Sequence, residues 1–233
     1  MIENSGGGLM TAVIVFLIVA FLYVMAMLYT RLFDSTGETT LAKHTLFVTA
    51  HPDDECMFFT PTIHAMRESS KLYLLVLSNG GYDGLGKERE KEMCLAAKHM
   101  GFVDYEVVDD KLIPDGPGKP GQKPNEIWDV EVVKKHVENY VKDKKKDGIN
   151  IETIVTFDDG GVSWHPNHIA THMGCIKYYK SDQYSGDMYI LETVQMFRKY
   201  NCFLDIFLSQ KDRVNYYLSS PYHAITALAI HYT

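Results

Sequence analysis

The sequence has no N-glycosylation motif and no paired-cysteine motif, and it contains only four cysteines. These cysteines are far apart in the chain and lie in apolar surroundings: Cys56, Cys94, Cys175 and Cys202. A disulfide-framed secreted domain is therefore excluded as an interpretation, and buried free thiols are expected instead. Free thiols and the missing glycosylation sites both favour a reducing compartment.

Basic residues are also few, because the chain after residue 30 has 23 Lys and Arg against 29 Asp and Glu, a net charge of −6. Nucleic-acid binding needs a net basic face, so no nucleic-acid partner is expected.

The chain has 233 residues, of which 46% are hydrophobic. This is enough for one well-packed catalytic domain and hardly enough for two.

The first part of the chain lacks charge over the 22 residues Leu9–Thr30. At about 1.5 Å per residue, a helix of this length would cross a hydrocarbon core of roughly 30 Å. A signal peptide is the alternative, but its apolar core is usually shorter and follows a basic start. We therefore predict a membrane anchor at residues 1–30, a linker at 31–42 and a single domain at 43–233. The first positive charges, Arg31 and Lys43, follow the apolar segment and place that domain in the cytosol.

After the linker, apolar runs that suit buried parallel strands alternate with stretches of helical period. The predicted strands are Thr45–Ala50, Tyr73–Ser78, Tyr105–Val108, Thr153–Phe157 and Met188–Val194, and the predicted helices are Lys87–Met100 and Asp129–Lys144. This pattern predicts an α/β fold, a Rossmann-like three-layer sandwich with a mostly parallel sheet of strand order 3-2-1-4-5.

Polar clusters follow the first and the fourth predicted strands. His51-Pro52-Asp53-Asp54-Glu55 follows the first strand, and Asp158 to His168, which ends in His165-Pro166-Asn167-His168, follows the fourth. In the predicted strand order these two strands are neighbours, so their carboxyl ends would bring the clusters together. Two His and one carboxylate, with a fourth position for water, are the ligands of a hydrolytic zinc site. Iron, cobalt and manganese accept the same ligand types, so another divalent metal remains an alternative.

These residues resemble the LmbE-like (PIG-L) deacetylase family, and most of all its eukaryotic members that deacetylate N-acetylglucosaminyl-phosphatidylinositol in glycosylphosphatidylinositol (GPI) anchor synthesis. The similarity begins with Ala50-His51-Pro52-Asp53-Asp54-Glu55 and His165-x-x-His168. It continues through Met57–Phe59, Asp83–Gly86, Arg89-x-x-Glu92, Val155–Asp158, Gly160–Ser163 and Arg198–Tyr200. The resemblance implies a zinc-dependent hydrolase of C–N bonds, with a glycolipid substrate and a domain on the cytosolic side of the endoplasmic reticulum membrane.

The same resemblance assigns roles within the two clusters. It implies that His51, Asp54 and His168 bind the metal and that Asp53 is the general base. It also implies that His165 faces the oxyanion that develops during hydrolysis, which the imidazole would stabilise if it is protonated. A carboxylate beside a zinc-bound water can take its proton, which fits this division of roles.

Further polar residues near the clusters receive weaker assignments. Arg89 resembles the substrate-binding arginine of the family, and the alternative is an exposed helix residue paired with Glu92. We expect Asp158 to orient a ligand imidazole, Glu55 to anchor the turn and His172 to serve packing. The glycine-rich loop after the second strand does not complete a GxGxxG motif, so no nucleotide is expected.

Two other functions remain open from the sequence. One is deacetylation of a soluble N-acetyl amino-sugar conjugate, and the other is an inactive, membrane-tethered binding module. An intact Asp53 and a complete ligand set count against the inactive module.

Overall fold

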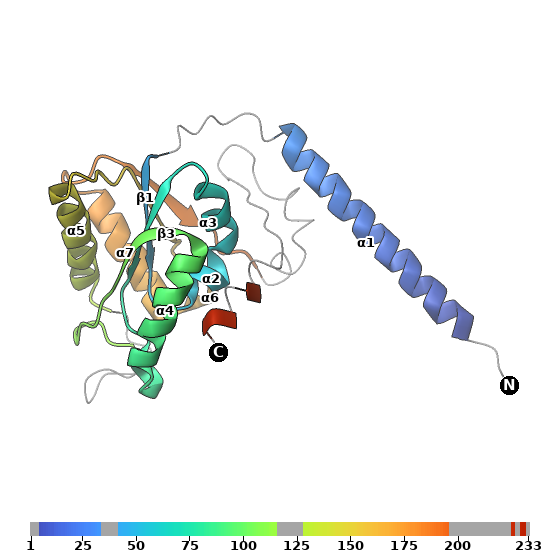
Figure 1. Cartoon of the computed structure of the whole chain (residues 1–233), viewed down its shortest axis with the longest axis horizontal. Helices are drawn as coiled ribbons and strands as arrows, with labels where there is room; N and C mark the ends of the chain where they lie inside the picture. The colour runs from blue at the N-terminus through green and yellow to red at the C-terminus, as the bar shows by residue number, and fades with distance from the viewer. Residues whose placement is uncertain (1–4, 34–41, 116–127, 196–224, 227–228, 232–233) are drawn as a thin grey trace. The chain divides into compact units, whose positions relative to one another are not determined.

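The computed structural model of the chain describes residues 5–33, 42–115, 128–195, 225–226 and 229–231 (Figure 1). The chain divides into two compact units, one formed by residues 1–39 and 194–216 and the other by residues 40–193 and 217–233. In the first unit, helix α1 (Ser5–Phe33) includes the whole of the uncharged segment. The side chains described in α1 are largely exposed.

Within the described residues, no helix combines the length and the apolar character that crossing a bilayer requires. The structure therefore does not support the predicted transmembrane helix at Leu9–Thr30. Most of the predicted linker, residues 31–42, lies outside the described residues.

The second unit alternates strands and helices along the chain. Its elements are β1 (His44–Thr49), α2 (Asp54–Phe58), α3 (Thr60–Met66), β2 (Lys71–Val76), η1 (Gly81–Asp83), α4 (Gly86–Met100), β3 (Phe102–Val107), α5 (Val130–Lys146), β4 (Thr153–Phe157), α6 (Gly161–Trp164), α7 (Pro166–Tyr179) and β5 (Asp187–Leu191). The strands form one sheet of order β3-β2-β1-β4-β5, and the described pairings are all parallel. The predicted α/β class and the predicted strand order are confirmed.

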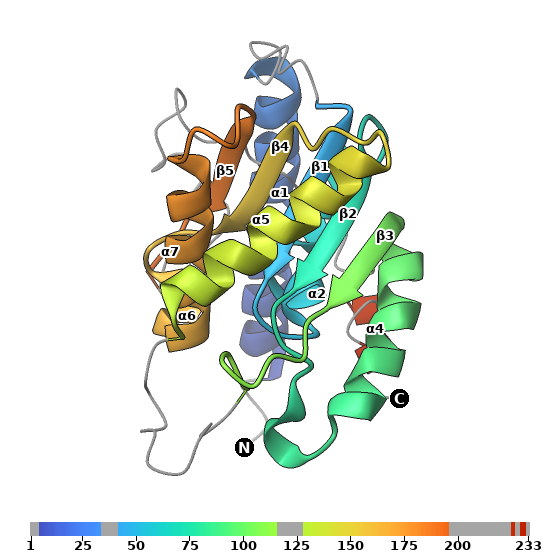
Figure 2. The same cartoon turned by 90° about the vertical axis from the view of Figure 1, so that its left-hand side faces the viewer.

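Helices cover both faces of this sheet. Helices α5 and α7 lie side by side on one face, and α2, α3 and α4 lie toward the other (Figures 1 and 2). Sheets buried on both faces are built from strands that are apolar at nearly every position. Strands β1, β2 and β4 follow this rule, because only their first residues, His44 and Lys71, escape full burial.

The predicted element boundaries are accurate where the sequence has a clear stop signal. Strand β4 occupies the predicted residues Thr153–Phe157, and α4 ends at Gly101, whose positive φ of 89° forms the expected C-terminal cap. Asp129 caps α5 by accepting a hydrogen bond from the backbone N–H of Glu131 at 2.9 Å. Strand β3 begins three residues before the prediction, because it is only partly buried and its first residues lack an apolar run.

Gly174 of α7 allows the close approach of α5. A Cβ atom at residue 174 would lie 2.7 Å from Val133 Cβ and 3.1 Å from the backbone nitrogen of Lys134. In an open helix, Gly→Ala stabilises by roughly 0.5–1 kcal/mol. Here we expect Gly174→Ala to lower the free energy of unfolding by about 1–3 kcal/mol, because the added methyl group overpacks the helix interface. Urea denaturation followed by circular dichroism measures this change.

The control is the same substitution in a Val133→Gly background, where the Val133 Cβ atom that the new methyl group would meet is removed. There the cost of Gly174→Ala should fall to less than half. Equal costs in the two backgrounds would show that this contact does not limit the packing of α5 on α7.

Candidate active site

Two loops meet at the carboxyl ends of β1 and β4. The first loop begins at Ala50 and leads into α2, and the second begins at Asp158 and leads through α6 into α7. The two strands are parallel neighbours in the centre of the sheet, so both loops leave the same edge. The structure thus brings together the two polar clusters singled out in the sequence, with His168 Nε2 3.3 Å from His51 Nδ1.

Three side chains present ligand atoms to one point between these loops. His168 Nε2 lies 3.2 Å from Asp54 Oδ1, and His51 Nδ1 lies 3.7 Å from Asp54 Oδ2. In a tetrahedral zinc site with bonds of about 2.0–2.1 Å, ligand atoms are separated by about 3.3 Å. The spacing of His51, Asp54 and His168 therefore fits a divalent cation at their centre.

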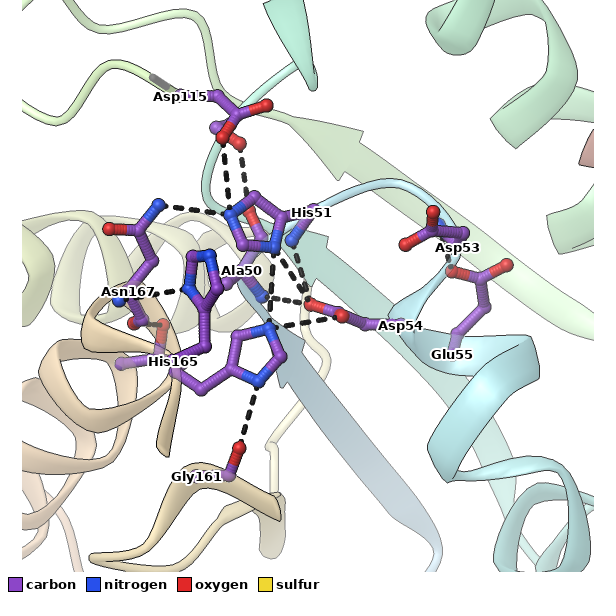
Figure 3. A network of polar contacts seen from close by, with 12 residues as sticks. Ala50, His51, Asp53, Asp54, Glu55, Asp115, Gly161, His165 and Asn167 are labelled. Atoms are coloured by element: carbon purple, nitrogen blue, oxygen red, sulfur yellow. Dashed lines mark hydrogen bonds and ion pairs between the residues drawn. The ribbon is translucent and has the colours of Figure 1, made fainter. Parts of the chain in front are cut away.

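Hydrogen bonds orient both imidazoles so that these nitrogens face the centre. His168 Nδ1 donates to the carbonyl oxygen of Gly161 at 2.9 Å. His51 Nε2 lies 3.4 Å from Asp115 Oδ1 and 3.0 Å from Asn167 Nδ2 (Figure 3). Because an amide nitrogen only donates, the carboxylate of Asp115 is the partner that can accept an N–H from His51. A ligand imidazole that gives its second N–H to a carbonyl or carboxylate is the usual arrangement in metal sites.

Asp54 is held in its ionised form. Its Oδ2 accepts hydrogen bonds from the backbone N–H groups of Ala50 and His51 at 3.0 and 2.8 Å. Burial acts to raise the pKa of Asp54, but its hydrogen bonds with His168 and His51 hold the pKa well below its usual value. The buried charge is thus retained where a cation would stabilise it.

His165 lies against the same group, with its ring centroid 4.9 Å from those of His51 and His168. Ligand atoms of His51, His165 and His168 lie within 4.8 Å of one another, so His165 could also reach a cation. Burial lowers the pKa of His165 to about 4, and the neighbouring His51 and His168 add to this effect. The stabilisation considered from the sequence requires a protonated imidazole here. The structure instead favours a neutral ring whose Nδ1 accepts from the Asn167 backbone N–H at 3.3 Å and whose Nε2 carries the proton.

Asp53 lies apart from the imidazoles, on the other side of Asp54 in Figure 3. Its backbone has φ 111° and ψ −23°, a left-handed conformation that is strained for a non-glycine residue and costs about 1–3 kcal/mol. Burial raises the pKa of Asp53 to about 6, Asp54 acts in the same direction and Arg89 opposes both. A carboxylate with this pKa suits a general base at neutral pH.

Arg89 reaches Asp53 from helix α4. Its Nη2 lies 2.5 Å from Asp53 Oδ2, so the pairing with Glu92 that the sequence left as an alternative is not the one seen. Gly80, at φ 68°, leaves the room for this side chain, because a Cβ atom there would lie 2.8 Å from Arg89 Cδ. The predicted contact of Arg89 with substrate stays a prediction.

Asp158 does not contact a ligand imidazole, contrary to our expectation. Its carboxylate accepts from the Gly160 backbone N–H at 3.1 Å and from both the backbone N–H and the hydroxyl of Thr193. These bonds tie the second loop to the segment after β5. The loop in turn presents the carbonyl of Gly161, which takes the role predicted for Asp158.

The other predicted residues have structural contacts. Glu55 anchors the turn as expected, because its Oε2 accepts from the Asp53 backbone N–H at 3.0 Å. His172 Nδ1 donates to the carbonyl of Phe157 at 2.8 Å, and the Phe157 ring stacks on His168 with centroids 4.3 Å apart. Free cysteines are found at Cys56, Cys94 and Cys175, and burial raises the pKa of the Cys56 thiol. Cys202 lies outside the described residues.

Comparison with known proteins decides the family. Residues 46–179, more than half of the chain, match the family described as PIG-L: GlcNAc-PI de-N-acetylase. The chain belongs to the PIG-L family. The membership predicted from the two motifs is thereby confirmed.

Similar proteins carry names of the same kind. A Schizosaccharomyces pombe protein named probable N-acetylglucosaminyl-phosphatidylinositol de-N-acetylase is 40% identical, over 78% of this chain and 70% of its own length. The Bos taurus N-acetylglucosaminyl-phosphatidylinositol de-N-acetylase is 35% identical, over 70% of this chain and 62% of its own length. The fold is similar to that of the N,N'-diacetylchitobiose deacetylase from Pyrococcus horikoshii, with a TM-score of 0.52 and 16% identity over 86% of this chain and 73% of that one.

Some residues of this PIG-L site have only a weak signal, or none, in the sequence. Asn167 stands inside the second motif, so a polar side chain beside two His could have been flagged. Asp115 belongs to a loop that is rich in proline and glycine. An acidic residue in the loop after the third predicted strand was the only sign that this residue could lie near the site. Thr193 and His231 have no local pattern, because only the tertiary fold brings them to the loops.

We expect His168→Ala to weaken zinc binding by more than about 100-fold. The substitution removes one of three converging ligand atoms, and even residues that only support a ligand contribute about 10- to 100-fold. Zinc titration followed by calorimetry measures the affinity. His172→Ala is the matched control, because it removes an imidazole one turn further along α7 that bonds to a carbonyl. Equal zinc affinity of the wild type and His168→Ala would contradict the proposed ligand set.

We expect catalysis to lose about tenfold per pH unit below about pH 6, because Asp53 must be ionised to act as a base. The fall in kcat/KM at low pH is the acid limb of the pH profile. In Arg89→Met this limb should move to higher pH by about one unit, since the guanidinium lowers the pKa of Asp53. The pH profile of kcat/KM measures both. Arg67→Met, which removes a remote arginine beside Glu68, should leave the limb in place. An unchanged limb in Arg89→Met would show that the pair does not tune the base.

Proposed function

We propose that this chain hydrolyses the acetamide of N-acetylglucosaminyl-phosphatidylinositol to glucosaminyl-phosphatidylinositol and acetate, a step of GPI-anchor biosynthesis. The observation that carries this proposal is the tetrahedral spacing of His51, Asp54 and His168 beside Asp53, an acid that stays outside the ligand set. The family and the names of the relatives support the substrate class.

The three donors suit zinc, since His nitrogen and carboxylate oxygen are its usual ligands in hydrolases. Iron, cobalt and manganese accept the same donors, so the metal used in cells is settled by metal analysis. When bound, the cation polarises the amide carbonyl and makes the attacking water more acidic. The chain supplies the remaining steps through Asp53 and His165.

Asp53 takes a proton from the attacking water while the water oxygen forms a bond to the amide carbon. A carboxylate with a pKa of about 6 accepts this proton at pH 7 and can return it to the leaving amine. The C–N bond then breaks, and acetate and a free glucosamine amine result. The left-handed backbone of Asp53 keeps its carboxylate outside the ligand set, so that this group can transfer protons instead of binding the cation.

His165 faces the oxyanion in this proposal. Its neutral ring has Nδ1 engaged with the Asn167 backbone, so Nε2–H is the available donor. A hydrogen bond from this N–H to the developing oxyanion lowers the barrier without a prior protonation step. Arg89 provides a positive charge beside the base. Its guanidinium has five donors, so it can hold Asp53 while it also binds a phosphate or hydroxyl of the substrate.

We further propose that the domain works at the cytosolic face of the endoplasmic reticulum membrane. A phosphatidylinositol-linked sugar is confined to a bilayer, so the enzyme must meet its substrate at a membrane surface. Free thiols at Cys56 and Cys175 suit a reducing compartment on the cytosolic side.

Acetate release tests the function directly. Purified protein loaded with zinc should release acetate from N-acetylglucosaminyl-phosphatidylinositol in detergent micelles. We expect Asp53→Asn to lose about 10²- to 10⁴-fold in kcat while it keeps its zinc, because it removes the base and leaves the ligands. Asp159→Asn, which neutralises an exposed acid of the second loop, is the matched control and should keep its rate.

Three results would overturn this proposal. Full activity of Asp53→Asn would remove the base from the mechanism. Acetate release from soluble N-acetyl amino-sugar conjugates alone would replace the lipid substrate, and no release from either substrate class would favour a binding module.

A further inference from the structure

A buried histidine from the end of the chain contacts the catalytic turn. His231 Nε2 lies 2.7 Å from Glu55 Oε1, and the two residues are 176 positions apart in the sequence. The side chains are 1% and 0% exposed. A carboxylate offers only acceptors, so the imidazole N–H donates to Glu55.

Glu55 passes this contact on to Asp53. Its other oxygen, Oε2, accepts from the Asp53 backbone N–H at 3.0 Å (Figure 3). The two oxygens of one carboxylate thus join His231 to the peptide group that carries the proposed base. The carbonyl side of Asp53 is held separately, by the backbone N–H groups of Cys56 and Met57 at 3.1 and 2.9 Å.

Asp53 needs this support because its backbone is left-handed at φ 111°. Such a conformation persists in a non-glycine residue only where surrounding contacts determine it. The direction of the Asp53 carboxylate depends on that conformation. A displacement of about 1 Å in a reacting group can cost about 100-fold in rate.

A metal ion is a different interpretation of the same residues, since ligand atoms of Glu55, Cys56 and His231 lie within 4.8 Å of one another. The geometry favours a hydrogen bond. The 2.7 Å between Nε2 and Oε1 is shorter than the separation of about 3.3 Å between two ligands of one tetrahedral ion. Cys56 Sγ also donates to the carbonyl of Asp53 at 3.0 Å, so it acts as a thiol there.

We propose that His231 is a positioning residue for deacetylation, acting through Glu55 to fix the backbone of Asp53. This inference rests on the proposed function, because it takes Asp53 as the base. His231 touches neither the ligand set nor the reacting atoms in this arrangement, and its effect on the rate comes from orientation.

Kinetics of three variants test the proposal. His231→Leu removes the donor and should lower kcat by about 10- to 100-fold, with KM changed less than about threefold and zinc content unchanged. His231→Gln keeps an N–H donor near the position of Nε2 and should restore kcat to within about threefold of the wild type. Glu55→Gln should reproduce the loss, and the double variant with His231→Leu should fall no further than the larger single loss.

His136→Leu is the matched control. It breaks another histidine–carboxylate pair, with His136 Nε2 2.9 Å from Asp110 Oδ2, which joins α5 to the segment after β3 and is partly exposed. This variant should keep its kcat. A comparable loss of kcat in His136→Leu would reduce the effect of His231 to general stability and overturn the proposal.

Hydrogen exchange of the Asp53 amide, followed by nuclear magnetic resonance, separates this inference from the proposed function. The amide should be protected in the wild type and should exchange more than about tenfold faster in His231→Leu and Glu55→Gln. Unchanged kcat and unchanged protection in His231→Leu would overturn the positioning role. Loss of one bound zinc in that variant would also overturn it, in favour of a second metal site. If the wild type releases no acetate, the proposed function fails, and the exchange measurement still decides whether His231 holds the turn.

Discussion

The burial of the Asp54 carboxylate is the constraint on which the rest of the site depends. This side chain is 2% exposed and stays ionised between two imidazoles and two backbone N–H groups. Removing a carboxylate from water costs several kcal/mol unless other groups compensate. The compensation must come from the carboxyl ends of β1 and β4, since β1 leads directly to His51 and the loop after β4 leads to His168 in the first turn of α7. In the proposed function, a divalent cation at that point would complete the compensation and provide the reactive centre.

Three acids in succession are stable here because each has its own partner. Asp54 faces the imidazoles, Asp53 pairs with Arg89 from α4, and Glu55 pairs with His231 from the end of the chain. The strained backbone at Asp53 turns the three carboxylates in different directions, which a regular helix start would not do. In the proposed mechanism, one short turn therefore divides metal binding, proton transfer and structural support among three neighbouring residues.

The sequence predicts most of this arrangement, and the limits of the prediction have physical causes. The buried runs of β1 and β4 and the polar residues after them are local patterns, so the strand order, the meeting of the two loops and the family could be inferred. The partners of these residues could not. Asp115 and His231 are distant in sequence, the reach of Arg89 depends on the glycine conformation at Gly80, and Asp158 binds Thr193 because of the path of the chain after β5.

Anomalous diffraction from crystals of the zinc-loaded protein, collected at the zinc edge, tests the central claim most directly. The account predicts one strong peak about 2.0–2.2 Å from His51 Nδ1, an Asp54 carboxylate oxygen and His168 Nε2, with Asp53 outside coordinating distance. A peak held by His165 in place of Asp54, or a peak at Glu55, Cys56 and His231, would contradict it.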